Sequence, residues 1–132
     1  DYPKHQLPKR SSKNSAGYDF FSPINEIIPA HGTAKIPTGV KAYMQPDEVL
    51  MIYPRSSIGF KTNIRLSNTT GVIDSDYYNN SDNEGHIMIK LQNEGVSDFE
   101  ITKGMKIVQG IFVKYLMVDN EEDKFVERTN DY

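Results

Sequence analysis

Short stretches in which apolar and polar residues alternate run along most of the chain. In residues 86–91, the aliphatic side chains Ile87, Ile89 and Leu91 fall on one face and the residues between them on the other. A period of two residues is typical of a half-buried β-strand. Further strands are predicted at residues 33–36, 40–44, 49–53 and 106–113.

Glycine and proline interrupt the sequence too often for long helices. The longest uninterrupted window, residues 111–132, begins with an apolar block at 111–118 and turns acidic at 121–123. We expect the block to form a buried strand followed by a turn rather than a helix. Many short strands separated by turn residues predict a single compact all-β domain, a sandwich or barrel, over residues 1–132.

The composition of the chain excludes several classes of binding partner and site. The 15 basic and 18 acidic residues give a net charge of −3, so no broad cationic surface is available for a nucleic acid. No apolar stretch approaches the roughly 18 residues of a membrane span. The chain has no cysteine, which excludes a disulfide framework, and His5, His31 and His86 are too scattered for a metal cluster. The compartment stays open, with an intracellular one, cytoplasm or nucleus, favoured.

Residues 54–61, Pro-Arg-Ser-Ser-Ile-Gly-Phe-Lys, follow an apolar run and combine Arg55 with the hydroxyls of Ser56 and Ser57. Cationic and hydroxyl donors beside a glycine are suited to binding a phosphate. By composition alone, a polar turn with a solvated arginine is the better explanation. The chain has no Gly-x-x-x-x-Gly-Lys loop, which excludes a Walker-type nucleotide site.

Residues 71–78, Gly-Val-Ile-Asp-Ser-Asp-Tyr-Tyr, carry two carboxylates and two tyrosines and lead into the turn-rich residues 79–85. We interpret the region as a hairpin with Asp74 at the end of its first strand. A carboxylate there can deprotonate a water that a neighbour such as Asn68 holds in place. Residue type alone favours the alternative that Asp74 and Asp76 only initiate the turn.

Two further segments, residues 16–20 and 103–110, are weak signals alone. Asp19 is explained by a strand end, and Gln109 by an outward-facing strand position. In this order and spacing, however, the four segments resemble the first four motifs of the trimeric dUTP pyrophosphatases (dUTPases). The family patterns run approximately A-G-x-D-L, P-R-S-G/S-x-A/G, G-x-I-D-x-D/G-Y and G-x-K/R-I/L-x-Q. The resemblance covers residues 16–110.

The resemblance implies a fold and a reaction. The fold would be an all-β, jelly-roll-like β-barrel subunit that forms a homotrimer, with sites at the subunit interfaces. The reaction would be hydrolysis of dUTP to dUMP and pyrophosphate by water attack on the α-phosphate, assisted by Mg2+. Such a hydrolysis needs charge neutralisation, a positioned water and a base, and the residues of the four segments supply each.

The resemblance also assigns roles at the base and sugar. Asp74 would activate the attacking water, and Asn68 would help to hold it. Tyr77 would pack on the deoxyribose and leave no space for a 2'-hydroxyl. Gly71 and Ile73 lie in the segment whose backbone would recognise uracil.

A second group of residues is assigned to the triphosphate. Arg55, Ser56 and Ser57 would bind the phosphates, with Ser56 near the oxygen that bridges the α and β phosphates. Gln109 would be another phosphate contact. Asp19 would lie near the magnesium and act on it through coordinated water.

The chain departs from the family pattern in three places. Ser57 stands where many members have glycine, a common variation that we treat as harmless. Residues 78–85 replace a short turn with an insertion, which leaves the far side of the uracil site undefined. The Gly-rich fifth motif of the family is absent; only Glu127 and Arg128 resemble its beginning, and we expect a Gly-rich lid to follow Tyr132.

Two alternatives stay open. One is a non-catalytic or regulatory β-trimer that binds a nucleotide or a protein partner. The other is dCTP deaminase, which is disfavoured because residues 87–92 contain no glutamate.

Overall fold

The computed structural model describes residues 6–121 and 125–129. Within them the chain is almost entirely strand and loop, which confirms the all-β prediction. None of its described helices is long and apolar enough to cross a bilayer. His5, Glu122 and Asp123, which entered the predictions above, lie outside the described residues. The elements are β1 (Tyr18–Phe21), β2 (Glu26–Ile28), β3 (Thr33–Pro37), β4 (Glu48–Pro54), α1 (Ser56–Gly59), β5 (Ile64–Leu66), β6 (Gly71–Asp74), the 3-10 helix η2 (Ser75–Tyr77), β7 (Met88–Asn93), β8 (Phe99–Ile101) and β9 (Lys106–Lys114).

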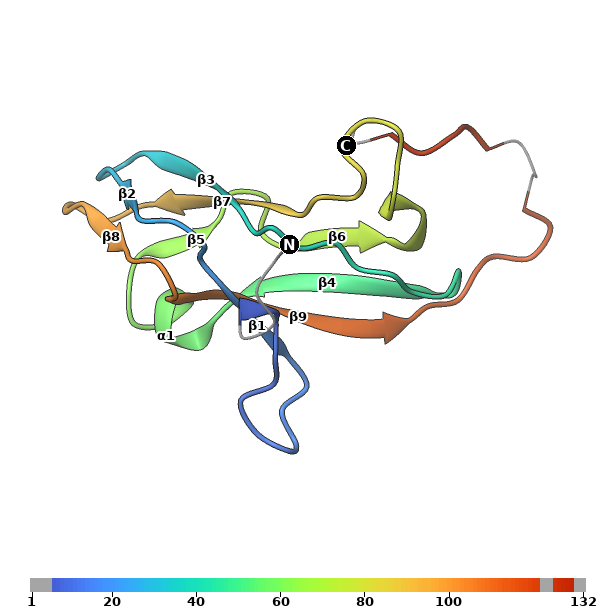
Figure 1. Cartoon of the computed structure of the whole chain (residues 1–132), viewed down its shortest axis with the longest axis horizontal. Coiled ribbons are helices and arrows are strands. Elements are labelled where there is room, and N and C mark those ends of the chain that lie inside the picture. The colour runs from blue at the N-terminus through green and yellow to red at the C-terminus, as the bar shows by residue number, and fades with distance from the viewer. Residues whose placement is uncertain (1–5, 122–124, 130–132) are drawn as a thin grey trace.

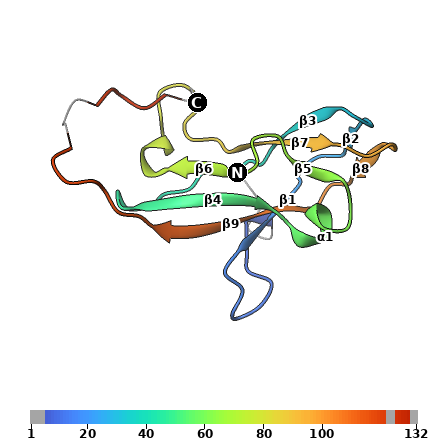
Figure 2. The ribbon, with the colours of Figure 1, turned by 180° about the vertical axis from the view of Figure 1, so that it is seen from behind.

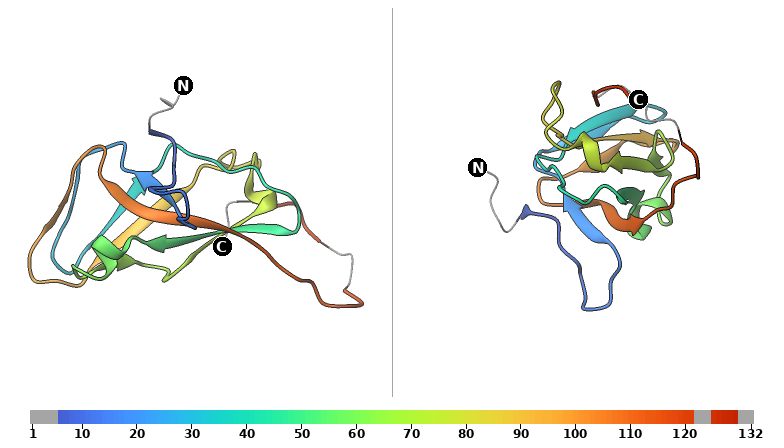
Figure 3. Two further views of the ribbon diagram at one scale, coloured as in Figure 1. Left: turned by 90° about the horizontal axis from the view of Figure 1, so that it is seen from below. Right: turned by 90° about the vertical axis from the view of Figure 1, so that its right-hand side faces the viewer.

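The strands pair antiparallel in three sheets, with the orders β1-β9-β4-β6, β3-β7-β5 and β2-β8. Figure 1 shows the long strands β4 and β9 side by side, with β3 and β7 in a layer above them, and Figure 3 shows the same layers from two other directions. In the described residues the three sheets are separate ladders rather than one closed barrel. The core between the layers includes Phe20, Ile36, Ile52, Ile89, Leu91 and Val108.

Most predicted runs become strands: β3, β4, β7 and β9 confirm four of them. In β7, Ile89 and Leu91 are buried whereas Met88 is half-exposed, as the alternation predicted. The strand predicted at residues 40–44 is wrong. Val40 and Met44 are buried, but in the described residues this segment belongs to no ladder, because alternation specifies a buried face and not a hydrogen-bonding partner.

The predicted hairpin around residues 71–91 is also wrong. β6 pairs with β4, whereas β7 pairs with β3 and β5. η2 and the loop after it therefore carry the chain from one sheet to another. β6 and β7 would each bury the same apolar face whether they paired with each other or with other strands. The apolar pattern therefore does not distinguish a hairpin from a crossover.

The apolar block at residues 111–118 is not a buried strand. The ladder ends where Lys114 meets Glu48, the first residue of β4, and Leu116 beyond it is 97% exposed. Figure 2 shows the chain leaving the sheet after β9. The block is apolar on nearly all sides, yet in the described part of the chain no neighbouring strand continues far enough to cover it.

Candidate active site

Three of the predicted motifs converge at one end of the four-stranded sheet. Asp19 of β1 lies opposite Gln109 of β9, and Gln109 in turn lies opposite Tyr53 of β4. Arg55 follows β4 directly. Because β9 lies between β1 and β4, residues far apart in the sequence become neighbours here. We call Asp19, Arg55 and Gln109 the phosphate cluster.

A buried ion pair organises the phosphate cluster. The Asp19 side chain is 6% exposed, and Arg55 Nε lies 2.9 Å from its Oδ1. Lys106 Nζ lies 3.6 Å from Oδ2 of the same carboxylate. A carboxylate buried to this extent needs cationic partners to offset its lost hydration. Arg55 is therefore not the solvated arginine of a polar turn, and that alternative is wrong.

The two serines of this segment begin α1. Ile58 and Gly59 donate their backbone N–H groups to the carbonyl of Arg55 at 2.9 and 2.7 Å, and the buried Ile58 anchors the turn. Ser56 and Ser57 are exposed beside the arginine, and Arg55 Nη1 donates to Ser57 Oγ at 3.4 Å. The hydroxyls and the guanidinium thus share one accessible polar surface.

The half-buried side chain of Gln109 lies between Pro54, at the end of β4, and Gly17, just before β1. Its Nε2 donates to the carbonyl of Pro54 at 3.4 Å. A Cβ on Gly17 would lie 2.3 Å from Gln109 Oε1, so glycine leaves the space that this side chain occupies. Gln109 is half-buried, so residue type alone gave an incomplete account of its position, and its role as a phosphate contact stays a prediction.

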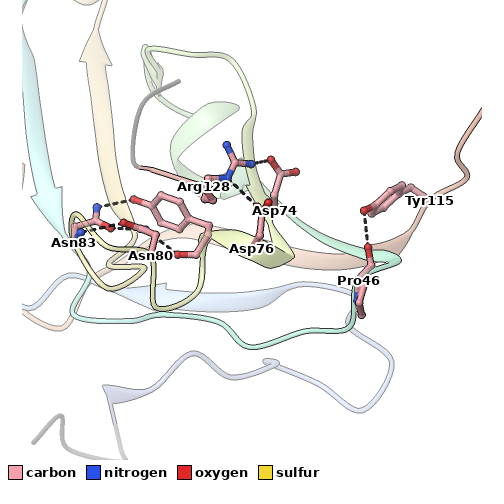
Figure 4. Close-up of polar contacts among 8 residues, drawn as sticks. Pro46, Asp74, Asp76, Asn80, Asn83, Tyr115 and Arg128 are labelled. Carbon is pink, nitrogen blue, oxygen red and sulfur yellow. Dashed lines mark hydrogen bonds and ion pairs between the residues drawn. The ribbon is translucent and has the colours of Figure 1, made fainter. Parts of the chain in front are cut away.

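Asp74 lies at the other end of β4, where it ends β6 opposite Val49. Its side chain is 48% exposed and accepts a hydrogen bond from Arg128 Nη2. Arg128 Nε also donates to Asp76 Oδ1 at 2.8 Å, so one guanidinium bridges both carboxylates (Figure 4). Asp74 precedes η2 without a side-chain cap bond, so turn initiation does not explain this carboxylate. Asp74, Asp76 and Arg128 form the carboxylate cluster.

A cleft of about 580 Å³ lies between the β5–β6 turn and β7, in the size range of small-molecule sites. Its walls are mostly aliphatic and include Asn68, Gly71 and Ile73. A Cβ on Gly71 would lie 2.9 Å from Ile52 Cβ, so glycine allows β6 to approach β4 this closely. Three of the residues predicted at the base and water are thereby brought together.

Tyr77 lies in η2 and is only 3% exposed. Its hydroxyl donates to the carbonyl of His86 at 3.0 Å and accepts from Asn83 Nδ2 at 2.7 Å. The ring is part of the hydrophobic core in this structure. Packing against a sugar therefore requires the groups that cover the ring to move.

The two clusters are separated along β4. Between Val49, which faces Asp74, and Pro54, which precedes Arg55, the extended chain spans about 17 Å. Figure 2 shows α1 and the end of β6 at opposite ends of β4. Within the described part of one chain, Asp74 and Arg55 therefore lie at different ends of the strand.

Sequence reasoning gave no site role to Lys106, Asp76 or Arg128. Lys106 occupies the K/R position of the fourth motif, and Arg128 resembles the start of the fifth, so both signals were present. Their partners depend on the fold, which pairs them with carboxylates distant in sequence. Among the described residues, no group of three or more Asp, Glu or His side chains is arranged to hold a metal ion.

Comparison with known proteins places the chain in a family. A family model described as dUTPase matches residues 4–132. The deoxyuridine 5'-triphosphate nucleotidohydrolase of Lactococcus lactis is 47% identical over 119 residues, covering 89% of this chain and 79% of the relative. That of Clostridium acetobutylicum is 35% identical over 118 residues, covering 89% and 77%. The crystal structure of dUTPase from Streptococcus mutans superposes with a TM-score of 0.84 at 42% identity, covering 90% of this chain and 93% of that one. The chain belongs to the dUTPase family.

Proposed function

We propose that this chain is the subunit of a dUTP diphosphatase, which hydrolyses dUTP to dUMP and pyrophosphate. Its family membership and the names of its relatives support the reaction. The observation that carries the proposal is the pair of clusters at the two ends of β4, one built around the Arg55 guanidinium and the other around the Asp74 carboxylate. Its nucleotide substrate makes an intracellular location, cytoplasm or nucleus, the expected one.

Asp74 is the general base in this proposal. Its half-exposed carboxylate follows Ile73, which lines the cleft, and Asn68 lies in the turn on the same cleft. A water held between Asp74 and Asn68 loses a proton to the carboxylate as its oxygen attacks the α-phosphate, and pyrophosphate leaves. Arg128 Nη2 contacts Oδ2 of Asp74, and the second carboxylate oxygen, Oδ1, would accept the proton in this arrangement.

The phosphate cluster binds the triphosphate. Arg55 uses Nε for Asp19, which helps to fix the plane of the guanidinium, and its Nη1 lies beside Ser57. A guanidinium held in one plane suits bidentate binding of phosphate oxygens. Gln109 adds an amide donor at the same end of the sheet.

Magnesium, when bound with the substrate, neutralises charge on the triphosphate. It is commonly held by one or two carboxylates together with substrate phosphates rather than by a dedicated cage. Asp19, beside Arg55 at the proposed phosphate end of the sheet, offers one such carboxylate. Asp19 would contact the ion through water because its oxygens already face Arg55 and Lys106.

The active assembly in this proposal is a homotrimer in which Arg55 and Asp74 of one site come from different subunits. The separation of the two clusters along β4 supports this. So do the exposed apolar side chains of residues 112–118, which a neighbouring subunit would cover. Closed homo-oligomers place different surfaces of identical chains together in this manner.

A turnover assay tests the function. The purified protein is incubated with dUTP, dCTP or dTTP, and both pyrophosphate and ammonia are measured. We expect pyrophosphate from dUTP alone. Tight nucleotide binding without turnover would indicate the non-catalytic alternative, and ammonia from dCTP would indicate a deaminase.

A further inference from the structure

The loop at residues 78–85, an insertion relative to the family pattern, folds tightly against Tyr77. Asn79 N–H donates to the carbonyl of Glu84 at 2.9 Å, and Glu84 N–H donates to that of Asn80 at 3.0 Å. Gly85 has a φ of 91°, and a Cβ there would lie 2.9 Å from the carbonyl oxygen of Tyr77. The insertion is thus a compact turn packed against the residue assigned to the sugar.

Two asparagines of the loop form an interlocking network. Asn80 is 7% exposed; its Nδ2 donates to the Tyr77 carbonyl and to Asn83 Oδ1, both at 2.8 Å. Asn80 Oδ1 accepts from the backbone N–H groups of Asp82 and Asn83 at 2.9 and 3.0 Å. Backbone N–H groups only donate, so they fix which way this amide points.

The orientation of Asn83 is fixed in the same way. Its Oδ1 accepts from Asn80 Nδ2 and from Gly85 N–H at 3.1 Å, so Nδ2 has to point to the other side. There it donates to the Tyr77 hydroxyl at 2.7 Å, while that hydroxyl donates to the His86 carbonyl at 3.0 Å. The buried phenol therefore accepts a hydrogen bond from the loop, at Asn83, and donates one to His86, the residue that follows the loop.

We propose that Asn83 is a positioning residue for Tyr77, and that the inserted loop thereby sets how strongly the enzyme distinguishes deoxyribose from ribose nucleotides. The inference rests on the proposed function, in which Tyr77 packs against the sugar. A steric test for one hydroxyl group depends on where the ring lies. Two hydrogen bonds at the far end of the ring hold its plane and depth.

The sharpest variant is Asn83→Asp. It keeps the size of the side chain and the oxygen that binds Asn80 and Gly85, but it replaces the donor to Tyr77 with a second acceptor. The phenol then has to turn its proton toward the new carboxylate and away from the His86 carbonyl. Ser81→Ala is the matched control, because Ser81 is exposed in the same loop.

The measurement is the ratio of kcat/KM for dUTP to that for UTP. We expect Asn83→Asp to lower this ratio about tenfold, mainly by improving UTP, and Ser81→Ala to leave it unchanged. Tyr77→Phe, which removes both hydrogen bonds of the phenol without changing a residue of the loop, should also lower the ratio. Adding Asn83→Asp to Tyr77→Phe should not lower the ratio further. If the variants acted by loosening the fold in general, their effects on the ratio would add. If Asn83→Asp does not fold, Tyr77→Phe alone still tests the inference.

The outcomes distinguish a wrong role for Asn83 from a wrong proposed function. If Tyr77→Ala lowers the ratio but Asn83→Asp and Tyr77→Phe do not, the role of Asn83 is wrong and the proposed function stands. If Tyr77→Ala leaves the ratio unchanged in an active enzyme, the sugar lies elsewhere and both fail. If the wild-type protein binds dUMP and UMP but does not hydrolyse dUTP, the function fails, and the ratio of the two dissociation constants tests the role of Asn83 instead.

Discussion

Arg55 and Asp74 lie at opposite ends of β4, one directly after Pro54 and the other opposite Val49. Within the described part of one chain, Arg55 pairs with Asp19 and Asp74 with Arg128. Hydrolysis of a triphosphate needs a cation on the phosphates and a base near the same phosphorus atom. Because these groups lie about 17 Å apart along the strand in one chain, the proposed trimer would bring Arg55 of one copy to Asp74 of another.

Complementation tests this sharing. Arg55→Ala and Asp74→Asn should each be nearly inactive, because one lacks the phosphate cation and the other the base. When the two are unfolded together at equal concentration and refolded, about a quarter of the sites should combine an intact Arg55 with an intact Asp74. Activity is compared with each variant refolded alone. Absence of any recovery, under conditions where the wild-type protein regains activity, would mean that both residues act from one chain.

Asp74→Asn should reduce kcat by about two to four orders of magnitude, the usual contribution of a positioned base, with a much smaller change in KM. The shape of the side chain is kept, so substrate binding is kept as well. Asp76→Asn is the control, since Asp76 shares Arg128 with Asp74 but is assigned no proton transfer. If Asp74→Asn and Asp76→Asn lost kcat equally, the assignment of proton transfer to Asp74 alone would be wrong.

Gly17→Ala should raise the KM for dUTP about threefold to tenfold, the value of one hydrogen bond to the substrate. The new Cβ would meet Gln109 Oε1 at 2.3 Å and displace the end of a flexible side chain, so the midpoint of thermal unfolding should change little. Gln109→Ala should have the same effect on KM. In that background Gly17→Ala should add nothing, and an additive effect would show that the glycine acts through something other than Gln109.

The strands with a simple alternation were predictable from the sequence. β7 was predicted from the spacing of Ile89 and Leu91, and the short loops were predicted from glycine and proline. The pairing of β6 was not predictable, because its apolar face is satisfied by β4 as well as by β7. Exposure of Leu116 was not predictable either, since an apolar residue can be covered by its own chain or by another.

The site, too, was predictable from the sequence only in part. The motif resemblance identified Asp19 and Arg55 as members of one site, but not that they form an ion pair with each other. That contact depends on the order of the strands in the sheet, in which β1 and β4 lie on either side of β9. The network of Asn80 and Asn83 around Tyr77 depends likewise on a turn geometry that local composition did not specify.

Asp19→Asn should weaken both the fold and phosphate binding. The carboxylate is 6% exposed between Arg55 and Lys106, and its replacement by a neutral amide leaves two cations near each other without a counter-charge. Breaking a fully buried pair costs about 3–5 kcal/mol. Both cations here are partly solvated, so we expect about 1–2 kcal/mol.

Unfolding in urea at a fixed protein concentration measures this loss, because the stability of an oligomer depends on concentration. The KM for dUTP should rise as well, since Arg55 loses the partner that fixes its guanidinium. Lys106→Met provides the comparison: its amine is farther from Asp19, at 3.6 Å, than the arginine nitrogen at 2.9 Å, so the loss should be smaller. A larger loss from Lys106→Met than from Asp19→Asn would place the main support of Asp19 on the lysine, and an unchanged KM in Asp19→Asn would show that Arg55 reaches the phosphates without it.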